Sequence, residues 1–423
     1  MNDIAIENGL LWLGSGECHQ GGLLYIKDGR VSYAGDHRAD VVPPGTERID
    51  AAGFAVLPGL VDCHVHLTTN SDTRRVIASD VFRGQKTGPE KLLHGYRNSL
   101  RALSAGFTTL RCMGHRGVGD TELRDMIAEG LMVGPNLVVA PWWITMTNGH
   151  GDLFYPSYTP RREWDTADGV DACREMVRLQ ARSGADFIKV MASGGMSKGE
   201  KPHWPNYTVA ELTAIVEEAH DMDLRVAAHA LSLEGIRRSI EAGVDSIEHG
   251  SYLDEDCADE MARKGIYLVP TMAFNDWCQR EGTTRGLTSS GVEGLRDAHD
   301  RTIEAFGLAR RAGVKIAMGT DSSGTLCPFG AHYRELELYV EHGMSTMEAL
   351  ATATRTASDL LDRPDVGSLR RGSIGDVLIV DKRVLDDISL LRGGIKSVVR
   401  SGRDISNYLA ASSEALELEV SPN

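Results

Sequence analysis

Five short apolar segments of this chain each end in a residue that can bind a metal ion, and this pattern limits the possible folds more than any other feature. The segments are VLPGLVDCHVH, ADFIKV, RVAAHA, DSIEHG and IAMGTDS. They carry, in chain order, His64 and His66, Lys189, His229, His249, and Asp321. A strand buried on both faces has a nearly continuous apolar sequence, which is typical of a parallel sheet covered by helices. Polar groups at the ends of such strands need a functional explanation, because burying them unpaired costs free energy.

The middle of the chain alternates strand and helix patterns, which predicts a (β/α)8 barrel. Helices are expected between the strands, for example over residues 91–104, 208–221 and 233–242. The eight predicted strands cover residues 56–67, 107–114, 136–144, 185–192, 225–230, 245–250, 266–272 and 314–321. A doubly wound sheet is the alternative, but it would not bring ligands from the first and last strands together. In a barrel, by contrast, catalytic residues gather at the carboxyl ends of the strands.

Both ends of the chain are rich in short β segments separated by Gly and Asp turns. We therefore expect a small β-sandwich domain built from residues 1–57 and 365–423, with the barrel over residues 58–364. The final segment, SSEALELEVSPN, is expected to form a loosely held tail. Three long stretches of the barrel are predicted to be loops that cover a site, namely residues 68–90, 145–168 and 273–295.

Charge and cysteine usage limit the possible partners. The net charge of −15 over 423 residues argues against nucleic acid or an anionic membrane as the main partner. The chain has no apolar stretch of 18 residues, so no membrane span is expected, and its start lacks a signal-peptide pattern. Seven scattered cysteines without a C-x-x-C pair fit reduced thiols and a cytoplasmic location. A small-molecule substrate is the expected partner.

The histidines and the aspartate predict a metal site as a group. His64 and His66 are two residues apart on a strand, so both side chains point to one face and can hold one ion. His229 and His249 are one βα unit apart and should lie at the same height on neighbouring strands. Each histidine alone could be a packed core residue, and Asp321 could be a helix N-cap. Together, in this register, they favour a metal centre.

Lys189 has a different significance, because an ammonium group is a poor metal ligand and is costly to bury beside cations. It could form a salt bridge or bind a phosphate. The chemical alternative is a neutral amine that reacts with CO2 to form a carbamate. Such an anion can bridge two divalent ions, as two-metal hydrolytic sites require.

These residues and their surroundings resemble the amidohydrolase superfamily, in its binuclear branch with a carboxylated lysine. The similar segments include LPGLVDCHVHL, GFTTLR, NGHGD, GADFIKVMASGG, GVDSIEHG and GSIGDVLIVD. Within that branch the chain resembles the imidazolonepropionase-like group, which includes prolidase-like Xaa-Arg dipeptidases and ochratoxin amidase. The resemblance covers nearly the whole chain but does not specify a substrate.

The resemblance implies two divalent metal ions, with zinc the first expectation and manganese or cobalt also suitable. It implies that His64, His66 and Asp321 hold the more buried ion. It also implies that His229 and His249 hold the more exposed ion, and that a CO2-derived carbamate on Lys189 and a hydroxide bridge both ions. Members of the family commonly assemble, so a homo-oligomer is expected.

Two further roles come from the resemblance. Asp321 would act as the catalytic acid–base group, taking a proton from the nucleophile and passing it to the leaving nitrogen. His150, in NGHGD, would lie at the carbonyl oxygen of the substrate. His115, Trp143 and Tyr207 are further candidates for substrate contact.

The chain departs from its dipeptidase relatives at Leu231, where they often carry a tyrosine or another polar group that helps to hold a substrate carboxylate. Leucine cannot pair with a carboxylate, which favours a neutral or aryl leaving group. Basic loop residues could replace the lost contact, and the candidates are Arg83, Lys86, Lys198 and Lys201.

The sequence thus predicts a metal-dependent hydrolase that cleaves an amide-type C–N bond in an amide, N-acyl amino acid, carbamate or urea. The first alternative is a prolidase-like dipeptidase that cleaves Xaa-Arg, Xaa-Lys or Xaa-Pro. A one-metal cyclic-amide hydrolase or deaminase is the second, because such enzymes need no lysine on the fourth strand. A non-catalytic scaffold is disfavoured, since no ligand is missing.

Overall fold

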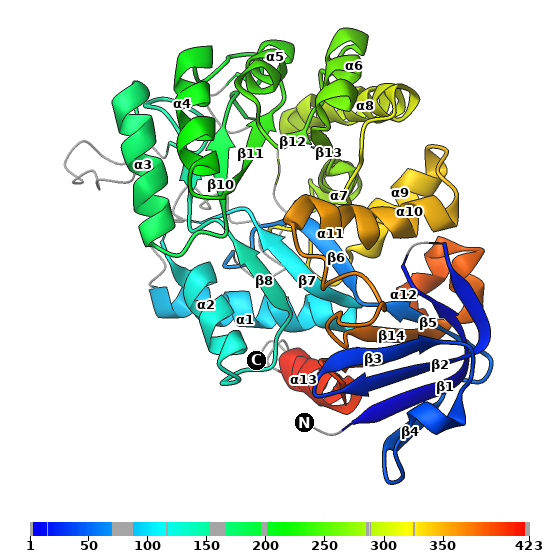
Figure 1. The fold of residues 1–423 in the computed structure, drawn as a ribbon. Coiled ribbons are helices and arrows are strands. Elements are labelled where there is room, and N and C mark those ends of the chain that lie inside the picture. Colours follow the sequence, from blue (N-terminus) through cyan, green and yellow to red (C-terminus); the bar gives the residue numbers. More distant parts are fainter. Residues whose placement is uncertain are drawn as a thin grey trace.

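The computed structural model describes residues 3–14, 16–69, 88–115, 117–152, 166–195, 201–284, 287, 289–324 and 326–418. A parallel barrel forms the centre of the molecule (Figure 1). Its regular strands are β6 (Leu60–Val65), β7 (Phe107–Cys112), β8 (Asn136–Val139), β9 (Trp143–Ile144), β10 (Phe187–Met191), β11 (Arg225–Ala230), β12 (Ser246–His249) and β13 (Tyr267–Val269). Neighbouring strands pair in parallel within a three-stranded and a five-stranded segment. The strands are almost entirely buried, as their apolar sequences predict.

The predicted eighth strand closes the barrel, although it is too irregular to form a continuous strand. It makes one parallel bridge to β13, between Leu268 and Ile316, and one to β6, between Val65 and Ser322. On the other side of the barrel, the backbone N–H of Asp186, just before β10, donates to the carbonyl of Val139 on β8 at 2.8 Å. The predicted (β/α)8 architecture is therefore confirmed.

The third predicted strand, over residues 136–144, is interrupted rather than continuous. β8 ends at Val139 and pairs with β7, whereas β9 begins at Trp143 and pairs with β10. Pro141 between them has no N–H to donate to a neighbouring strand. The backbone also passes close to Gly114, where a side chain would meet the backbone of Trp142 at 2.9 Å. The break turns the chain at the carboxyl edge of the barrel.

Helices cover the outside of the barrel (Figure 1). They are α1 (Gly88–Ser104), α2 (Gly119–Ala128), α3 (Val170–Arg182), α4 (Val209–His220), α5 (Leu233–Ala242), α6 (Glu255–Lys264), α7 (Met272–Glu281), α8 (Ser289–Ala312), α9 (Tyr333–Glu341), α10 (Thr346–Thr352) and α11 (Arg355–Leu361). The local signals explain their ends. A capping box between Thr208 and Glu211 starts α4, and Gly243 in the left-handed conformation ends α5. None of the helices described here is suited by length and hydropathy to span a lipid bilayer.

One of the three loop predictions, for residues 273–295, is wrong. Within this stretch, residues 273–281 belong to α7 and residues 289–295 to α8. The side-chain oxygens of Glu335 accept hydrogen bonds from the backbone N–H groups of Met272 and Ala273, so a residue distant in sequence supplies the N-terminal cap of α7. Thr271, which stands at the N-cap position and is of a type that often caps helices, makes no capping hydrogen bond with its side chain. The other two predicted loops lie largely outside the described residues.

The two ends of the chain form one mixed sheet, in the order β16-β15-β14-β5-β1-β2-β3, with β4 paired to β1 (Figure 1). Its strands are β1 (Ile4–Trp12), β2 (Cys18–Lys27), β3 (Arg30–Gly35), β4 (Glu47–Asp50), β5 (Phe54–Pro58), β14 (Val377–Asp381), β15 (Ile395–Arg400) and β16 (Arg403–Asp404). The predicted composite β domain is thus confirmed, whereas its exact division from the barrel at residues 58 and 365 stays a prediction.

The sheet shares its core with the barrel through β5 and β14. Val56 on β5 packs into the sheet's own apolar cluster, while its neighbours Ala55 and Leu57 point to the opposite face and join the main barrel core. β5 then passes into β6 through Gly59, where a side chain would collide with Thr108. This close joint fixes the start of β6, which carries His64.

The predicted loose tail is partly helical. Helix α13 (Ser406–Leu418) includes the first residues of SSEALELEVSPN and lies beside α1. The hydroxyl groups of Tyr96 on α1 and Tyr408 on α13 are 2.6 Å apart. The short elements of this region are the 3-10 helices η1 (Ala39–Val41), η3 (Lys382–Leu385) and η4 (Ile388–Leu390), and α12 (Leu391–Gly394).

Candidate metal centre

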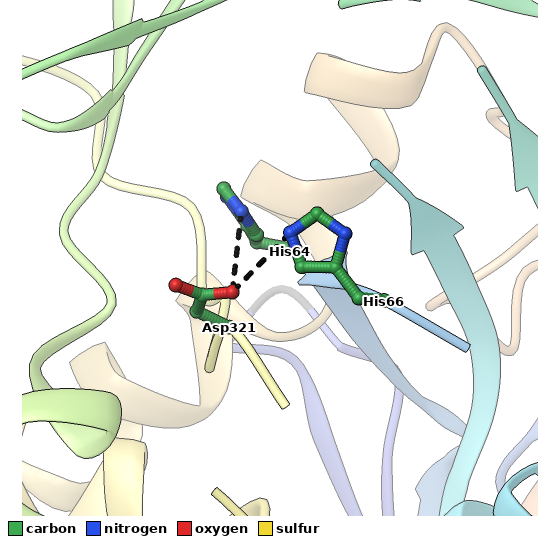
Figure 2. A group of neighbouring side chains, drawn as sticks. All are labelled: His64, His66 and Asp321. Atoms are coloured by element: carbon green, nitrogen blue, oxygen red, sulfur yellow. Dashed lines mark ion pairs between the residues drawn. The ribbon is translucent and has the colours of Figure 1, made fainter. Parts of the chain in front are cut away.

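His64, His66 and Asp321 converge at the carboxyl edge of the barrel (Figure 2). Oδ1 of Asp321 lies 3.7 Å from Nε2 of His64 and 3.4 Å from Nε2 of His66. One ligand atom from each residue lies within 4.8 Å of the other two. Two imidazoles and a carboxylate are ligands that zinc and related ions bind well. This group is consistent with a metal site.

The backbone holds the three ligands in register. The N–H of Asp321 donates to the carbonyl of His64, and the N–H of His66 donates to the carbonyl of Ser322, each at 2.8 Å. Asp321 itself has a left-handed backbone with φ of 56°, which is uncommon for a non-glycine residue. His249 shares this feature, with φ of 69°. Strained backbone of this kind collects at functional sites, where the surrounding structure fixes it.

A buried carboxylate locks the two strands together below the ligands. Asp62 accepts the N–H groups of His64 and Thr320 at 2.9 and 3.1 Å, and also the hydroxyl of Thr320 at 2.6 Å. Its second oxygen lies 2.7 Å from Nδ1 of His332. Because these groups are fully or almost fully buried, the network keeps β6 and the last strand at a fixed height.

Each of the four predicted imidazole ligands has a polar partner at one of its ring nitrogens. Such partners fix the tautomer and orientation of a metal-binding histidine. The contacts are Nδ1 of His64 with Glu248 at 2.7 Å, Nδ1 of His66 with the carbonyl of Gly114 at 2.9 Å, Nδ1 of His249 with the Thr271 hydroxyl at 2.7 Å, and Nε2 of His229 with the carbonyl of Gly194 at 3.4 Å.

Burial favours the neutral form of three of the predicted imidazole ligands, His64, His229 and His249. Burial lowers the pKa of His64 well below its ordinary value, and the nearby Lys189 cation lowers it further. Burial also lowers the pKa of His229 and His249 well below the ordinary value, with neighbouring histidines as the next cause. A neutral imidazole keeps the lone pair that a metal ion needs.

Lys189 is buried on β10, and its Nζ has no hydrogen-bond partner among the described residues. Burial lowers its pKa to about 8, although Glu248 and Asp321 oppose this shift. An amine in this state is partly neutral near physiological pH. No hydrogen bond within the described part of the chain therefore explains why this amine is buried.

His229, His249 and His150 form a second group of rings beside the first. The ring centres of His229 and His249 are 4.6 Å apart, and that of His249 is 5.0 Å from His64. His150 stacks on His229 with its ring centre 4.4 Å away. The structure therefore brings together all six predicted metal ligands and His150, and among the described residues only the group of His64, His66 and Asp321 has the mutual spacing of a ready-made site.

The predicted substrate-binding residues have different positions. Between ring centres, Trp143 lies 6.1 Å from His66 and 6.4 Å from His115. Trp143 and His115 therefore lie beside the candidate site. Leu231 directly follows β11, and its backbone N–H donates to the Ser193 hydroxyl.

Tyr207 differs, because it is a core side chain whose hydroxyl donates to the carbonyl of Ala167 at 3.0 Å. This placement gives no support to the prediction that Tyr207 binds substrate. The other candidate contacts, Arg83, Lys86 and Lys198, lie outside the described residues, and Lys201 is exposed over the ring of Trp204.

Sequence reasoning missed the buried residues around the ligands, above all Glu248, Arg111 and Asp62. Glu248 and Asp62 stand in the same apolar segments as the ligands, directly before His249 and two residues before His64. Arg111 interrupts the apolar segment FTTLRC in the same way. A charged residue inside a buried strand was the available signal, since such residues are buried only when paired.

A parallel (β/α)8 barrel with His64, His66 and Asp321 grouped at its carboxyl edge is the arrangement of a metal-dependent barrel hydrolase. The chain belongs to the Amidohydrolase family, whose sequence profile matches residues 55–405. It is a hydrolase that acts on C–N bonds.

Ochratoxinase from Aspergillus niger is 33% identical over 414 residues, which cover 92% of this chain and 83% of that protein. Its crystal structure superposes with a TM-score of 0.82 and 31% identity, covering 96% of this chain and 95% of the other. A Xaa-Pro dipeptidase crystal structure with bound methionine has a TM-score of 0.86 and 28% identity, covering 95% and 99% of the two chains. Imidazolonepropionase from Salinispora arenicola is 26% identical over 382 residues, covering 84% of each chain.

Proposed function

We propose that this protein is a binuclear metal-dependent amidohydrolase that cleaves an amide-type C–N bond of a small molecule. The observation that carries the proposal is the buried Nζ of Lys189. It has no hydrogen-bond partner among the described residues, and its charge acts on the pKa of His64, His229 and His249. The burial of this lysine near the predicted histidine ligands is explained if its amine is converted to an anionic carbamate. That anion could bind two metal ions, one held by each pair of histidines.

Carbamate formation supplies that anion. The neutral amine of Lys189 attacks CO2, a C–N bond forms, and one proton leaves, so the side chain changes from a potential cation to a carboxylate. His64, His66 and Asp321 would hold one divalent ion, and His229 and His249 the other. Zinc suits these nitrogen and oxygen ligands, as do manganese and cobalt. When bound, two such ions lower the pKa of water and polarise a carbonyl group.

The protein's own residues would handle the proton and orient the substrate. Asp321, with its carboxylate at the meeting point of His64 and His66, is placed to take a proton from the attacking water and deliver it to the leaving nitrogen. His150, stacked on His229, would donate to the substrate carbonyl oxygen. Both steps would depend on holding these two groups in the right geometry beside the substrate.

Apolar and aromatic groups beside the site favour a substrate without a free carboxylate next to the scissile bond. Leu231 and Trp143 offer no cation, and Lys201 lies exposed over Trp204. We therefore propose an aryl or bulky amide, carbamate or urea as the substrate class. The likeness to a Xaa-Pro dipeptidase keeps the prolidase-like activity as the alternative.

A one-metal enzyme is the second alternative, and one observation favours it. Among the described residues, only His64, His66 and Asp321 have ligand atoms that all lie within 4.8 Å of one another. A cyclic-amide hydrolase or deaminase with a single ion would need no carbamate. The two hypotheses differ in the role of Lys189.

Elemental analysis of metal per chain tests the proposal. Wild type and Lys189→Ala would be produced with added zinc and bicarbonate, beside Lys315→Ala as a matched control, because Lys315 lies in the same barrel but outside the predicted ligand set. We expect about two ions in wild type and in the control, and a sharp loss in Lys189→Ala. One ion in all three would establish the one-metal alternative.

Activity assays would then decide the substrate class. Anilides, carbamates and ureas would be compared with N-acyl amino acids and with Xaa-Pro and Xaa-Arg dipeptides at equal concentration. We expect hydrolysis of substrates that lack a free carboxylate. Activity confined to the dipeptides would establish the dipeptidase alternative, and activity confined to N-acyl amino acids would overturn the preference for substrates without a free carboxylate. We also expect a homo-oligomer, which sedimentation velocity would detect.

A further inference from the structure

Glu248 is a fully buried carboxylate directly behind a predicted metal ligand. It lies on β12, and its Oε2 is 2.7 Å from Nδ1 of His64, while Nε2 of the same ring faces Oδ1 of Asp321 at 3.7 Å. The imidazole is thus held between a carboxylate at one nitrogen and the candidate ion site at the other. Nothing in the catalytic scheme above uses Glu248.

The second oxygen of Glu248 is held by two donors. Nη2 of Arg111 donates to Oε1 at 2.8 Å, and the hydroxyl of Ser246 donates to the same atom at 2.5 Å. Arg111 is itself anchored, because its Nε donates to the carbonyl of Cys63 at 2.5 Å. The donors come from β7 and β12, so the network crosses the barrel interior and fixes the carboxylate in one orientation.

We propose that Glu248 is a positioning residue that selects the metal-binding tautomer of His64, and that Arg111 and Ser246 fix its orientation. A carboxylate accepts hydrogen bonds, so it keeps the imidazole proton on Nδ1 and leaves the lone pair of Nε2 free for an ion. The inference rests on the metal site of the proposed function, and it applies whether that site holds one ion or is part of a pair.

The network also fixes what the amide of a Glu248→Gln variant would do. Arg111 and Ser246 both donate, so the carbonyl oxygen of the new side chain would remain with them and its NH2 group would face His64. Nδ1 would then have to accept, and the ring proton would move to Nε2, which could no longer bind an ion. An alanine imposes no such constraint and lets Nδ1 keep its proton.

The test compares Glu248→Gln with Glu248→Ala. Zinc affinity of each metal-free protein would be measured by competition with a chromophoric chelator, beside the thermal midpoint. We expect Glu248→Gln to bind zinc about 10–100-fold more weakly than wild type, the usual loss when such a partner is removed, and more weakly than Glu248→Ala. Glu218→Gln is the matched control, because its carboxylate is paired with Arg178 on the outer helices, and it should keep wild-type affinity.

A purely structural role predicts the opposite order. Alanine leaves a cavity and is the more disruptive change, so weaker binding by Glu248→Ala than by Glu248→Gln would overturn the proposal. Both variants remove the same charge beside Arg111, which makes their comparison independent of that loss.

A second measurement does not depend on bound metal. In metal-free protein labelled with ¹⁵N-histidine, the His64 signals, identified by their absence in His64→Asn, report which ring nitrogen carries the proton. We expect Nδ1–H in wild type and Nε2–H in Glu248→Gln. An unchanged tautomer would contradict the inference. If wild type bound no zinc, the proposed function would fail, whereas the tautomer result would still decide the role of Glu248.

Discussion

The hydroxyl of Thr271 lies 2.7 Å from Nδ1 of His249, and Thr271 has a left-handed backbone with φ of 52°. A β-branched residue is a genuine outlier in this conformation. The residue lies two positions after the end of β13 and directly before α7. Its strained backbone therefore aims a hydroxyl at a predicted ligand of the more exposed ion.

Removal of this hydroxyl should weaken metal binding without unfolding the protein. We expect Thr271→Val, which keeps the shape of the side chain, to lower affinity for the second zinc ion about 10–100-fold. Thr271→Ser keeps the hydroxyl and should bind nearly as wild type does. Isothermal titration of metal-free protein with zinc measures both. Equal loss in the two variants would show that packing, not the hydrogen bond, matters here.

Glu335 predicts a pH dependence of stability. Burial raises the pKa of this carboxyl group to about 8, so the folded state binds a proton that the unfolded state releases above its ordinary pKa near 4.5. The contribution is fully present below that ordinary value and is lost as pH rises through about 8. We expect the thermal midpoint of wild type to fall over this window relative to Glu335→Gln, by at least a few degrees.

The comparison between wild type and Glu335→Gln isolates this group. Burial also raises the pKa of Asp120, to about 6, and this adds a change of the same direction to both proteins. The difference between the two midpoints, measured from about pH 5 to about pH 9 so that it brackets the shifted pKa, removes that shared part. A difference that does not vary with pH would refute the assigned proton.

Lys189 predicts a pH dependence of metal uptake. Burial lowers its pKa to about 8, so the fraction of reactive neutral amine rises about tenfold per pH unit below that value and levels off above it. Stripped protein would be mixed with zinc at a fixed partial pressure of CO2. We expect the rate at which the second zinc is taken up to follow this curve and to vanish without CO2. Uptake independent of CO2 would exclude the carbamate.

Leu231 predicts a change of specificity. We expect Leu231→Tyr to improve kcat/KM for N-acyl amino acids about tenfold relative to Leu231→Phe, because a hydrogen bond to a charged group contributes about 1.5–3 kcal/mol. Leu231→Phe adds the same ring without the hydroxyl and serves as the control. Equal values for the two variants would show that this position does not face the substrate carboxylate.

Much of the fold could be predicted because buried strands and helix faces have recognisable patterns of apolar residues in the sequence. The apolar segments around His229 and His249 gave β11 and β12, and the helix predicted over residues 208–221 is α4, residues 209–220. The terminal sheet was predicted because both ends of the chain consist of short β segments separated by Gly and Asp turns. Local patterns of this kind depend on the faces that a segment buries.

The errors of prediction arise where contacts between residues distant in sequence determine the structure. α7 lies in a stretch predicted as a loop from its length, and the side chain that caps this helix belongs to Glu335, which lies 63 positions from Met272. The contacts of Glu248 with Arg111 and His64 join residues separated by 137 and 184 positions. No window of sequence holds such a pair, so the sequence can mark Glu248 and Arg111 as charged residues in buried strands but cannot show which side chains they contact.

The pairing of β5 with β14 has a consequence for how the chain folds. Phe54 is paired with Asp381, so this ladder cannot form until nearly all of the chain has been synthesised. Contacts of such long sequence separation form late and slow the folding of a domain. Until β14 has been synthesised, the edge of β5 that pairs with it has no partner strand, while the barrel segments between them are synthesised. Late closure of this sheet joins the two ends of the chain only after the segments that carry the metal ligands have been synthesised.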